Sequence, residues 1–515
     1  MELWFLLPLA LSLSLCLALK SIIHHLSLPK SIQSKLSLPP GPLKVPIIGS
    51  FVFLRISSPF KMEPILRNLC HKYGPIITLH IGSHPAIFIT NHSLAHQALV
   101  ENGTVFADRH PLGSPSRIVN NNPLSINSAP YGPVWRLLRR NITYEILHPS
   151  RVKSYGHGRR WVLQILIKRL RNHVQSGESV PVIDHFQYAM FCLVVLMCFG
   201  RKFDEKIIRE IEYVQRTLIV NLRRFSVLAF LPKLGKIIFR NRWNQLLELR
   251  RRQESVLIPI IRARREIKNK KQDKGNPDDE FLVSYVDTLF DLKIPDDGRN
   301  LTEGEIMTLC SEFLNGGTDT TATELQWIMA NLVKNQGVQE KLYSEIEGVV
   351  NSGEEIREED LQKMPYLKAV VLEGLRRHPP SHFVLPHAVT EDIVLDGHVI
   401  PKKATVNFMV AEMGWDPKVW KDPMEFKPER FLSEEGVVFD ITGSREIKMM
   451  PFGVGRRICP GIGLAILHLE YFVANLIRDF KWTAVDGDDV DLSEKPEFTI
   501  AMKNPLRAHI SPRLP

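Results

Sequence analysis

The residues with the clearest chemical potential surround one cysteine, Cys459. The stretch 451–461 reads as a loop that brings a thiolate to the start of a helix, with Pro460 in the first helical turn, where its missing N–H costs nothing. Unpaired amide donors and the positive end of the helix dipole would favour the thiolate there. Arg457 can neutralise an anionic group of a ligand, and Gly455 leaves room for a flat one. The alternative is that Cys459 is a small buried apolar residue.

A second group of small and polar residues interrupts a long apolar helix. Thr302 and Glu305 form a capping box, and apolar residues at helical spacing stand on both sides of the sequence Gly-Gly-Thr-Asp-Thr-Thr at 316–321. Two glycines weaken a helix, and buried Asp and Thr side chains compete for its backbone hydrogen bonds. We therefore expect the helix to bend around a ligand. The alternative is a tolerated polar patch.

Two further pairs have helical spacing. Trp135 and Arg139 are four residues apart and share one helix face. Glu373 and Arg376 are three apart, near the end of a helix that His378-Pro379-Pro380 should stop. Taken alone, the first pair fits a basic surface helix, and the second fits an ordinary ion pair of small energy.

Together these patterns resemble the cytochrome P450 family. The cysteine loop fills every fixed position of that family's ligand signature, F-x-x-G-x-R-x-C-x-G, with Phe452, Gly455, Arg457, Cys459 and Gly461. The family's other patterns are matched by the oxygen-activation sequence at 316–321, W-x-x-x-R at 135–139, E-x-x-R at 373–376, P-E-R-F at 428–431 and a proline-rich hinge at 39–42. They stand in the family's order, and the chain most resembles a plant microsomal member.

The resemblance implies haem b as cofactor, with Cys459 as the axial thiolate ligand of the iron. The other residues implied to contact or make room for the haem are Phe452, Arg457, Trp135, Arg139, His387 and Gly317. Asp319 and Thr320 are implied to deliver protons during oxygen activation. Glu373, Arg376 and Arg430 are implied to form a structural triad. The alternative for His387 is an ordinary surface histidine.

The implied fold is mainly α-helical with small β-sheets, preceded by a single transmembrane helix. Residues 76–82 and 86–90 read as two strands joined by a turn. Residues 152–274 read as several helices whose basic clusters we interpret as solvated faces. The long loop at 106–130 covers the substrate pocket in the family. We expect residues 268–279 to form an exposed, partly disordered loop.

An apolar run at 3–19 is close to the length of a bilayer span. Because basic residues follow the run, the positive-inside rule predicts a signal anchor with the body in the cytosol. We therefore expect a membrane anchor at 1–25, a basic linker and hinge at 26–45, and a catalytic domain at 46–515. This organisation places the protein in the endoplasmic reticulum membrane as a single-pass protein. Cleavage of the run as a signal peptide is the alternative.

Composition fits a globular chain, since 44% of its residues are hydrophobic. The net charge of +10 favours acidic partners or a membrane surface, but no recognition motif points to nucleic acid. Six irregularly spaced cysteines read as reduced thiols. No CxxC pair is present, which argues against zinc and iron–sulfur sites.

The implied reaction is NADPH- and oxygen-dependent monooxygenation of a lipophilic small molecule. Electrons would come from NADPH–cytochrome P450 reductase, with cytochrome b5 as a further candidate donor. The segments 381–386 and 498–502, together with Phe313, suggest an apolar pocket for the substrate. Two alternatives are a same-fold enzyme that rearranges peroxides without a reductase and a non-catalytic membrane protein that binds haem or a ligand. The intact Asp319–Thr320 pair argues against both.

A secreted glycoprotein is a separate alternative. Four asparagines, Asn91, Asn102, Asn141 and Asn300, begin glycosylation sequons. An occupied sequon would contradict the cytosolic topology.

Overall fold

The computed structural model describes residues 37–42, 59–81, 84–110, 117–118, 124–225, 228, 235–274, 282–351, 353–432, 439–485 and 489–513. The chain divides into two compact units. The first comprises Met1–His110, Phe383–Met413 and Asp440–Ile458, and the second comprises Pro111–His382, Gly414–Phe439 and Cys459–Pro515. Each unit is therefore built from segments that are far apart in the sequence.

A four-stranded sheet forms the centre of the first unit. Its strands are β1 (Ile76–Ile81), β2 (His84–Ile89), β4 (His387–Ala388) and β7 (Thr405–Phe408), in the order β1-β2-β7-β4. β2 is antiparallel to β1 and parallel to β7, so Ile87 lies opposite Val406. Both side chains are fully buried in an apolar core that also contains Leu99 and Phe106. The two strands expected from residues 76–90 are confirmed.

Short helices and a hairpin surround this sheet. The other described elements are α3 (Pro59–Tyr73), α4 (His92–His96), the π-helical turn η1 (Gln97–Glu101), β5 (Ile393–Leu395), β6 (His398–Ile400), α18 (Val410–Gly414) and the 3-10 turn η4 (Gly455–Arg457). Asp396 and Gly397 turn the β5–β6 hairpin with φ of 50° and 72°. This Asp-Gly pair suits a turn that needs positive φ twice.

The proline-rich segment at 37–42, expected to form a hinge, is part of the first unit. The N–H of Thr78 in β1 donates to the carbonyl of Pro40 at 2.9 Å, and that of Val399 donates to Ser37 at 3.0 Å. A Cβ atom at Gly41 would lie 2.0 Å from the carbonyl oxygen of Thr78. The backbone at 37–42 is therefore docked on β1, where only glycine fits at position 41.

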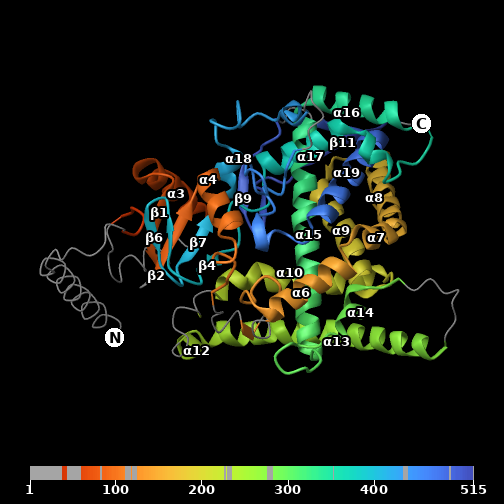
Figure 1. Ribbon diagram of the computed structural model, residues 1–515. Coiled ribbons are helices and arrows are strands. Elements are labelled where there is room, and N and C mark those ends of the chain that lie inside the picture. Colours follow the sequence, from red (N-terminus) through yellow and green to blue (C-terminus); the bar gives the residue numbers. More distant parts are fainter. Residues whose placement is uncertain are drawn as a thin grey trace, which may run out of the picture. The chain divides into compact units, whose positions relative to one another are not determined.

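The second unit is mostly helical (Figure 1). Its helices are α6 (Pro133–Glu145), α7 (Pro149–Ser154), α8 (Gly156–Ser176), α9 (Val182–Phe199), α10 (Glu205–Phe225), α12 (Gly235–Ile238), α13 (Arg240–Lys274), α14 (Tyr285–Leu289), α15 (Glu303–Lys334), α16 (Gln336–Val349), α17 (Pro365–Arg377) and α19 (Ile462–Asp479). Two 3-10 turns, η2 (Asp360–Lys363) and η3 (Pro428–Phe431), complete them. The helices expected between 152 and 274 are confirmed.

Two small sheets join these helices. The first has the order β3-β11-β8, and the second pairs β10 with β9. Their strands are β3 (Val180–Pro181), β8 (Phe480–Ala484), β9 (Glu494–Pro496), β10 (Ile500–Met502) and β11 (Arg507–Pro512). All of these pairings are antiparallel. The mixture of many helices with small sheets confirms the expected fold class for the described residues.

Helix α15, green in Figure 1, is the long central element of the second unit. Its predicted capping box is present, because the side chain of Thr302 accepts from Glu305 N at 3.3 Å and that of Glu305 accepts from Thr302 N at 2.7 Å. The helix packs extensively along α9. Among the described residues, α9 is the one helix long and apolar enough to span a membrane, and 83% of it is buried inside the protein. A helix that is apolar all round and buried in this way acts as a core helix.

The basic region departs from expectation in two places. Residues 268–274 continue helix α13 instead of forming a loop. The basic clusters are solvated at Arg251, Arg252 and Arg262, as expected. The side chains of Arg250 and Arg264 are the exceptions, because they are buried. Arg264 pairs with Asp287 at 2.5 Å, and Arg250 donates to Thr308 Oγ1 at 3.0 Å. These two arginines therefore hold α13 to its neighbours.

The predicted anchor at 1–25 lies outside the described residues. So do residues 26–36 and 43–58, which include most of the expected linker, and the larger part of 111–123. Residues 275–279 of the expected loop also lie outside them.

Candidate functional site

Cys459 lies where the sequence predicts it, directly before α19. Its side chain is half-buried. Burial raises the pKa of the Cys459 thiol, while the N–H of Gly461 and the charge of Arg139 lower it. Burial is the largest of the three effects, while the N–H of Gly461 acts in the expected direction and favours the thiolate. A coordinated metal ion would supply the missing positive charge, since metal-bound thiols are deprotonated.

Two details of the cysteine loop differ from expectation. Helix α19 begins at Ile462 with Gly461 as its N-cap, so Pro460 precedes the helix and does not form its first turn. Gly455 does not leave room for a ligand: its φ is 73°, and a Cβ atom there would lie 2.0 Å from the carbonyl oxygen of Leu99. This glycine is required because the loop crosses the backbone of η1. Phe452 is half-buried in the turn that precedes it.

Trp135 and Arg139 share a face of α6, as predicted. Trp135 is buried, and its ring lies 5.3 Å from that of Tyr131. Burial lowers the pKa of Arg139, and the sulfur of Cys459 opposes this shift. The structure therefore brings Arg139 into electrostatic range of Cys459 within the second unit.

The arginine beside the cysteine fits an anionic group. Within the described residues, half-buried Arg139 forms no ion pair and no hydrogen bond. A buried cation is costly unless it is paired. Haem contains an iron and carries two carboxylate groups. The thiol of Cys459 can bind the iron, and the guanidinium of Arg139 can pair with a carboxylate. The residues of the second unit thus fit the cofactor implied by the sequence.

Like Phe452, the predicted residues His387 and Arg457 lie in the first unit. His387 in β4 is buried, and its Nδ1 lies 2.6 Å from the carbonyl oxygen of Phe106. The alternative of a surface histidine is therefore wrong. Burial lowers the pKa of His387 to about 3, and the charges of Arg109 and Arg457 contribute to this shift. Arg457 donates from Nε to the carbonyl of Ala107 at 2.7 Å.

Arg109 is the second arginine, besides Arg457, whose charge acts on His387. The sequence analysis missed it. Its Nη1 donates to the carbonyls of Leu385 and Pro386 at 3.1 and 2.9 Å. Burial lowers the pKa of Arg109 to about 10. A single arginine in a loop rich in proline and asparagine gave little signal, because its partners come from a distant segment.

Asp319 and Thr320 lie on α15, both half-buried. The hydroxyl of Thr320 donates to the carbonyl of Gly316 at 2.8 Å, which is the back-bonding that the sequence suggested. Burial raises the pKa of Asp319, Arg216 lowers it, and Glu212 and Glu497 raise it further. An acid and an alcohol therefore occupy successive positions, with the acid biased toward its protonated form.

The two glycines of this helix differ in their surroundings. A Cβ atom at Gly317 would lie 3.1 and 3.2 Å from the methyl groups of Val194 in α9, whereas nothing lies within 4 Å of one at Gly316. Gly317 therefore permits close helix packing, and its expected role of leaving space for the haem is wrong. Gly316 has the open side.

The predicted triad is confirmed. Arg376 donates to both oxygens of Glu373, at 2.7 and 2.8 Å, and Arg430 donates to Oε1 at 3.0 Å. Glu373 and Arg376 are almost fully buried. Because this cluster joins α17 to η3, its role is structural.

The apolar residues expected to line a pocket are packed within their own units or exposed. In the second unit the ring centroids of Phe313 and Tyr285 lie 4.9 Å apart in a tilted arrangement. In the first unit the ring centroids of Phe383 and Phe88 lie 6.4 Å apart, edge to face. Leu385 and Phe498 are 52% and 49% exposed. The segment that follows Phe498 is held to α15, because Thr499 bonds Thr323 at 2.9 Å and the carbonyl of Ile500 accepts from Trp327 at 2.8 Å.

A long central helix with an Asp–Thr pair, a buried Glu–Arg–Arg triad and a cysteine before a buried helix define the class of cytochrome P450 folds. A family model described as cytochrome P450 matches residues 39–510. The chain belongs to the cytochrome P450 family.

Relatives in plants are similar over nearly the whole chain. "Cytochrome P450 89A9" of Arabidopsis thaliana is 49% identical over 489 residues, which cover 92% of this chain and 94% of the relative. "5-epiaristolochene 1,3-dihydroxylase" of Nicotiana tabacum is 30% identical over 495 residues, 94% of each chain. Named relatives of this kind are oxidoreductases, and the chain is an enzyme of that class.

A solved structure of a zebra fish cytochrome P450 with abiraterone has a similar fold. Its TM-score is 0.71 at 21% identity, and the match covers 88% of this chain and 100% of that one. This likeness confirms the cytochrome P450 fold.

Proposed function

We propose that this protein is a haem–thiolate monooxygenase that oxidises a lipophilic small molecule with electrons from NADPH. The observation that carries the proposal is the half-buried thiol of Cys459 beside Arg139, a cation with no anionic partner among the described residues. Together these two residues suit an iron and a carboxylate. Family membership gives this combination its chemical meaning.

Cys459 would ligate the iron of haem b, and Arg139 and Trp135 on α6 would bind a haem carboxylate. Arg457 and His387 are proposed for the same carboxylate-binding role, and Phe452 for apolar contact with the cofactor. When bound, the haem supplies activation of dioxygen and transfer of one oxygen atom to the substrate. The protein orients the cofactor, and a thiolate ligand favours cleavage of the O–O bond.

Asp319 and Thr320 would supply protons. Because burial raises the pKa of Asp319, its carboxyl holds a proton more readily than an exposed one and would feed it into a network of waters around the Thr320 hydroxyl. The Thr320 hydroxyl donates to the carbonyl of Gly316 in this structure, and it would rotate toward bound dioxygen when the haem is present. This acid–alcohol pair has no use in a protein that only binds a ligand.

NADPH–cytochrome P450 reductase is the proposed electron donor, with cytochrome b5 as a second donor. The net charge of +10 favours acidic docking partners. We place the protein in the endoplasmic reticulum membrane, with its catalytic domain in the cytosol, on the basis of the apolar run and the basic residues after it. The name of the Nicotiana tabacum relative, a dihydroxylase of 5-epiaristolochene, supports hydroxylation of an apolar substrate.

Reconstitution with purified reductase tests the proposal. Full-length protein should consume NADPH and oxygen and form an oxygenated product from members of a library of lipophilic compounds. Omitting the reductase should abolish the product. Conversion of hydroperoxides without reductase or NADPH would favour the peroxide-rearranging alternative instead.

A further inference from the structure

Two histidines of the second unit meet where helix α8 is followed by helix α9. His173 lies in the last turn of α8, and His185 lies near the start of α9. Their Nε2 atoms are 3.2 Å apart, and their ring planes are inclined at 79°. Both side chains are half-buried. Neither histidine belongs to the candidate haem site, so the pair needs an explanation of its own.

The separation of the two nitrogens suits a shared metal ion. Zinc binds imidazole nitrogen at about 2.0–2.1 Å in tetrahedral geometry, so two of its nitrogen ligands lie roughly 3.3–3.4 Å apart. The 3.2 Å between His173 and His185 is close to that value. A square-planar ion such as copper(II) has a smaller angle between neighbouring ligands and would bring the nitrogens closer together. The geometry therefore favours a tetrahedral ion. A hydrogen bond between the two rings is the alternative.

The surroundings keep one of these imidazoles neutral. Burial lowers the pKa of His185 to about 4, and the charges of His173, Arg169 and Arg209 add to this shift, whereas Asp184 opposes it. His185 therefore carries no proton on one of its ring nitrogens at pH 7. A neutral imidazole is the form of histidine that binds metal ions.

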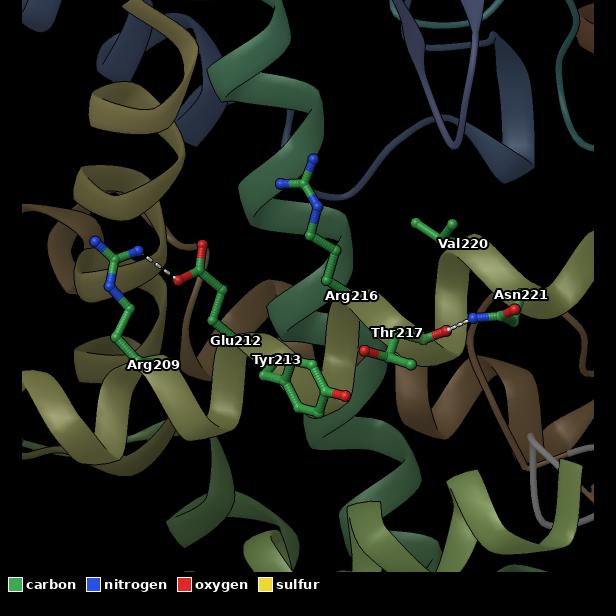
Figure 2. A pocket seen from close by; sticks show the side chains of 7 residues that line it. All are labelled: Arg209, Glu212, Tyr213, Arg216, Thr217, Val220 and Asn221. Carbon is green, nitrogen blue, oxygen red and sulfur yellow. Dashed lines mark hydrogen bonds and ion pairs between the residues drawn. The ribbon is translucent and has the colours of Figure 1, made fainter. Parts of the chain in front are cut away.

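The two arginines near the pair have carboxylate partners. Arg169 donates to Glu205 at 2.7 Å, and Arg209 pairs with Glu212 at 2.9 Å within α10 (Figure 2). Both guanidinium groups also lie over the ring of Tyr188, at 3.8 and 4.2 Å from its centre. The carboxylates offset the repulsion that the arginines would exert on a bound cation.

We propose that His173 and His185 bind one zinc ion through their Nε2 atoms, and that this ion fastens the end of α8 to the start of α9. Among the described residues no third histidine, cysteine or carboxylate completes the site. Water would fill the remaining positions of a tetrahedral ion. Because both rings are partly exposed, the ion can enter from solvent. The proposal does not rest on the proposed function.

Anomalous diffraction at the zinc edge tests the position of the ion, in crystals of the full-length protein grown with zinc. We expect a peak about 2.0–2.1 Å from both Nε2 atoms. Crystals in which both rings are ordered and no peak lies between them would overturn the proposal and leave a hydrogen bond between the rings.

Equilibrium dialysis of the untagged full-length protein against micromolar zinc tests the ligands in solution. We expect His173→Asn and His185→Asn each to bind one zinc ion per chain fewer than the wild type. His157→Asn is the matched control and should bind as the wild type does, because His157 is an exposed histidine at the other end of α8. Equal binding by all four proteins would overturn the proposal, since the zinc would then sit on other surface groups.

Thermal unfolding with and without zinc tests the link between the two helices. A ligand that binds only the folded state raises the unfolding temperature. Zinc should therefore raise it in the wild type and in His157→Asn, and by less in His173→Asn and His185→Asn. The melts without zinc show whether each variant is folded. An equal rise in all four proteins would contradict the assigned ligands.

Discussion

Replacing Glu373 by glutamine should destabilise the second unit strongly. The Glu373 carboxylate is fully buried and accepts four hydrogen bonds: two from Arg376, one from Arg430 and one from the backbone N–H of Lys427 at 2.8 Å. Glutamine keeps the size of the side chain but removes its charge and one acceptor. Two guanidinium groups then lose their counter-charge, one of them fully buried.

Removing one partner of a buried ion pair costs about 3–5 kcal/mol. With a urea slope of about 3 kcal/mol per M, the unfolding midpoint of Glu373→Gln should fall by roughly 1–1.7 M. Tryptophan fluorescence reports on the second unit, because all the described tryptophans, among them Trp327 and Trp420, belong to it.

Glu429→Gln is the matched control for this experiment. Its carboxylate pairs with Lys341 at 2.7 Å, and both side chains are about half exposed. Such surface pairs contribute about 0–1 kcal/mol. If Glu373→Gln lost no more stability than Glu429→Gln, the assignment of Glu373 as the centre of a structural triad would be refuted.

Three other predictions concern α15. Gly316→Ala should raise stability by up to about 1 kcal/mol, whereas Gly317→Ala should lower it because its methyl group meets Val194; urea titration of the pair would show equal effects if the packing account were wrong. Burial raises the pKa of Glu324 well above its usual value. The free energy of unfolding of the wild type is therefore highest at low pH, where Glu324 is protonated, and falls as the pH rises toward the raised pKa. Glu324→Gln should therefore be more stable than wild type at pH 8, and by less at pH 5; a pH-independent difference would count against a buried, protonated Glu324. Thr320→Ala should keep the haem but lower product formed per NADPH consumed, and unchanged coupling would remove Thr320 from proton delivery.

Much of the fold and of the candidate site could be predicted from patterns of residues that are close in sequence. The capping box at Thr302 and the spacing of Glu373 and Arg376 depend on neighbours within one helical turn. The cysteine loop and the Asp319–Thr320 pair were found for the same reason, because their residues are adjacent in sequence.

Features that depend on distant partners were not predicted. The burial of Arg264 depends on Asp287, and a run of basic residues gives no sign of that contact. Gly317 packs against Val194 in another helix. The sequence around Gly317 does not show this contact, so a packing role could not be distinguished from making room for a ligand. The position of Arg109 depends on the carbonyls of Leu385 and Pro386, which are distant in sequence.

The carbon monoxide difference spectrum of the reduced full-length protein tests the central claim most directly. A thiolate ligand from Cys459 predicts a strongly red-shifted Soret band that disappears in Cys459→Ala. Cys70→Ala is the control, because Cys70 is a free, partly exposed cysteine of the other unit. A folded protein that binds no haem, or a red-shifted band that survives in Cys459→Ala, would contradict the assignment of Cys459 as the iron ligand.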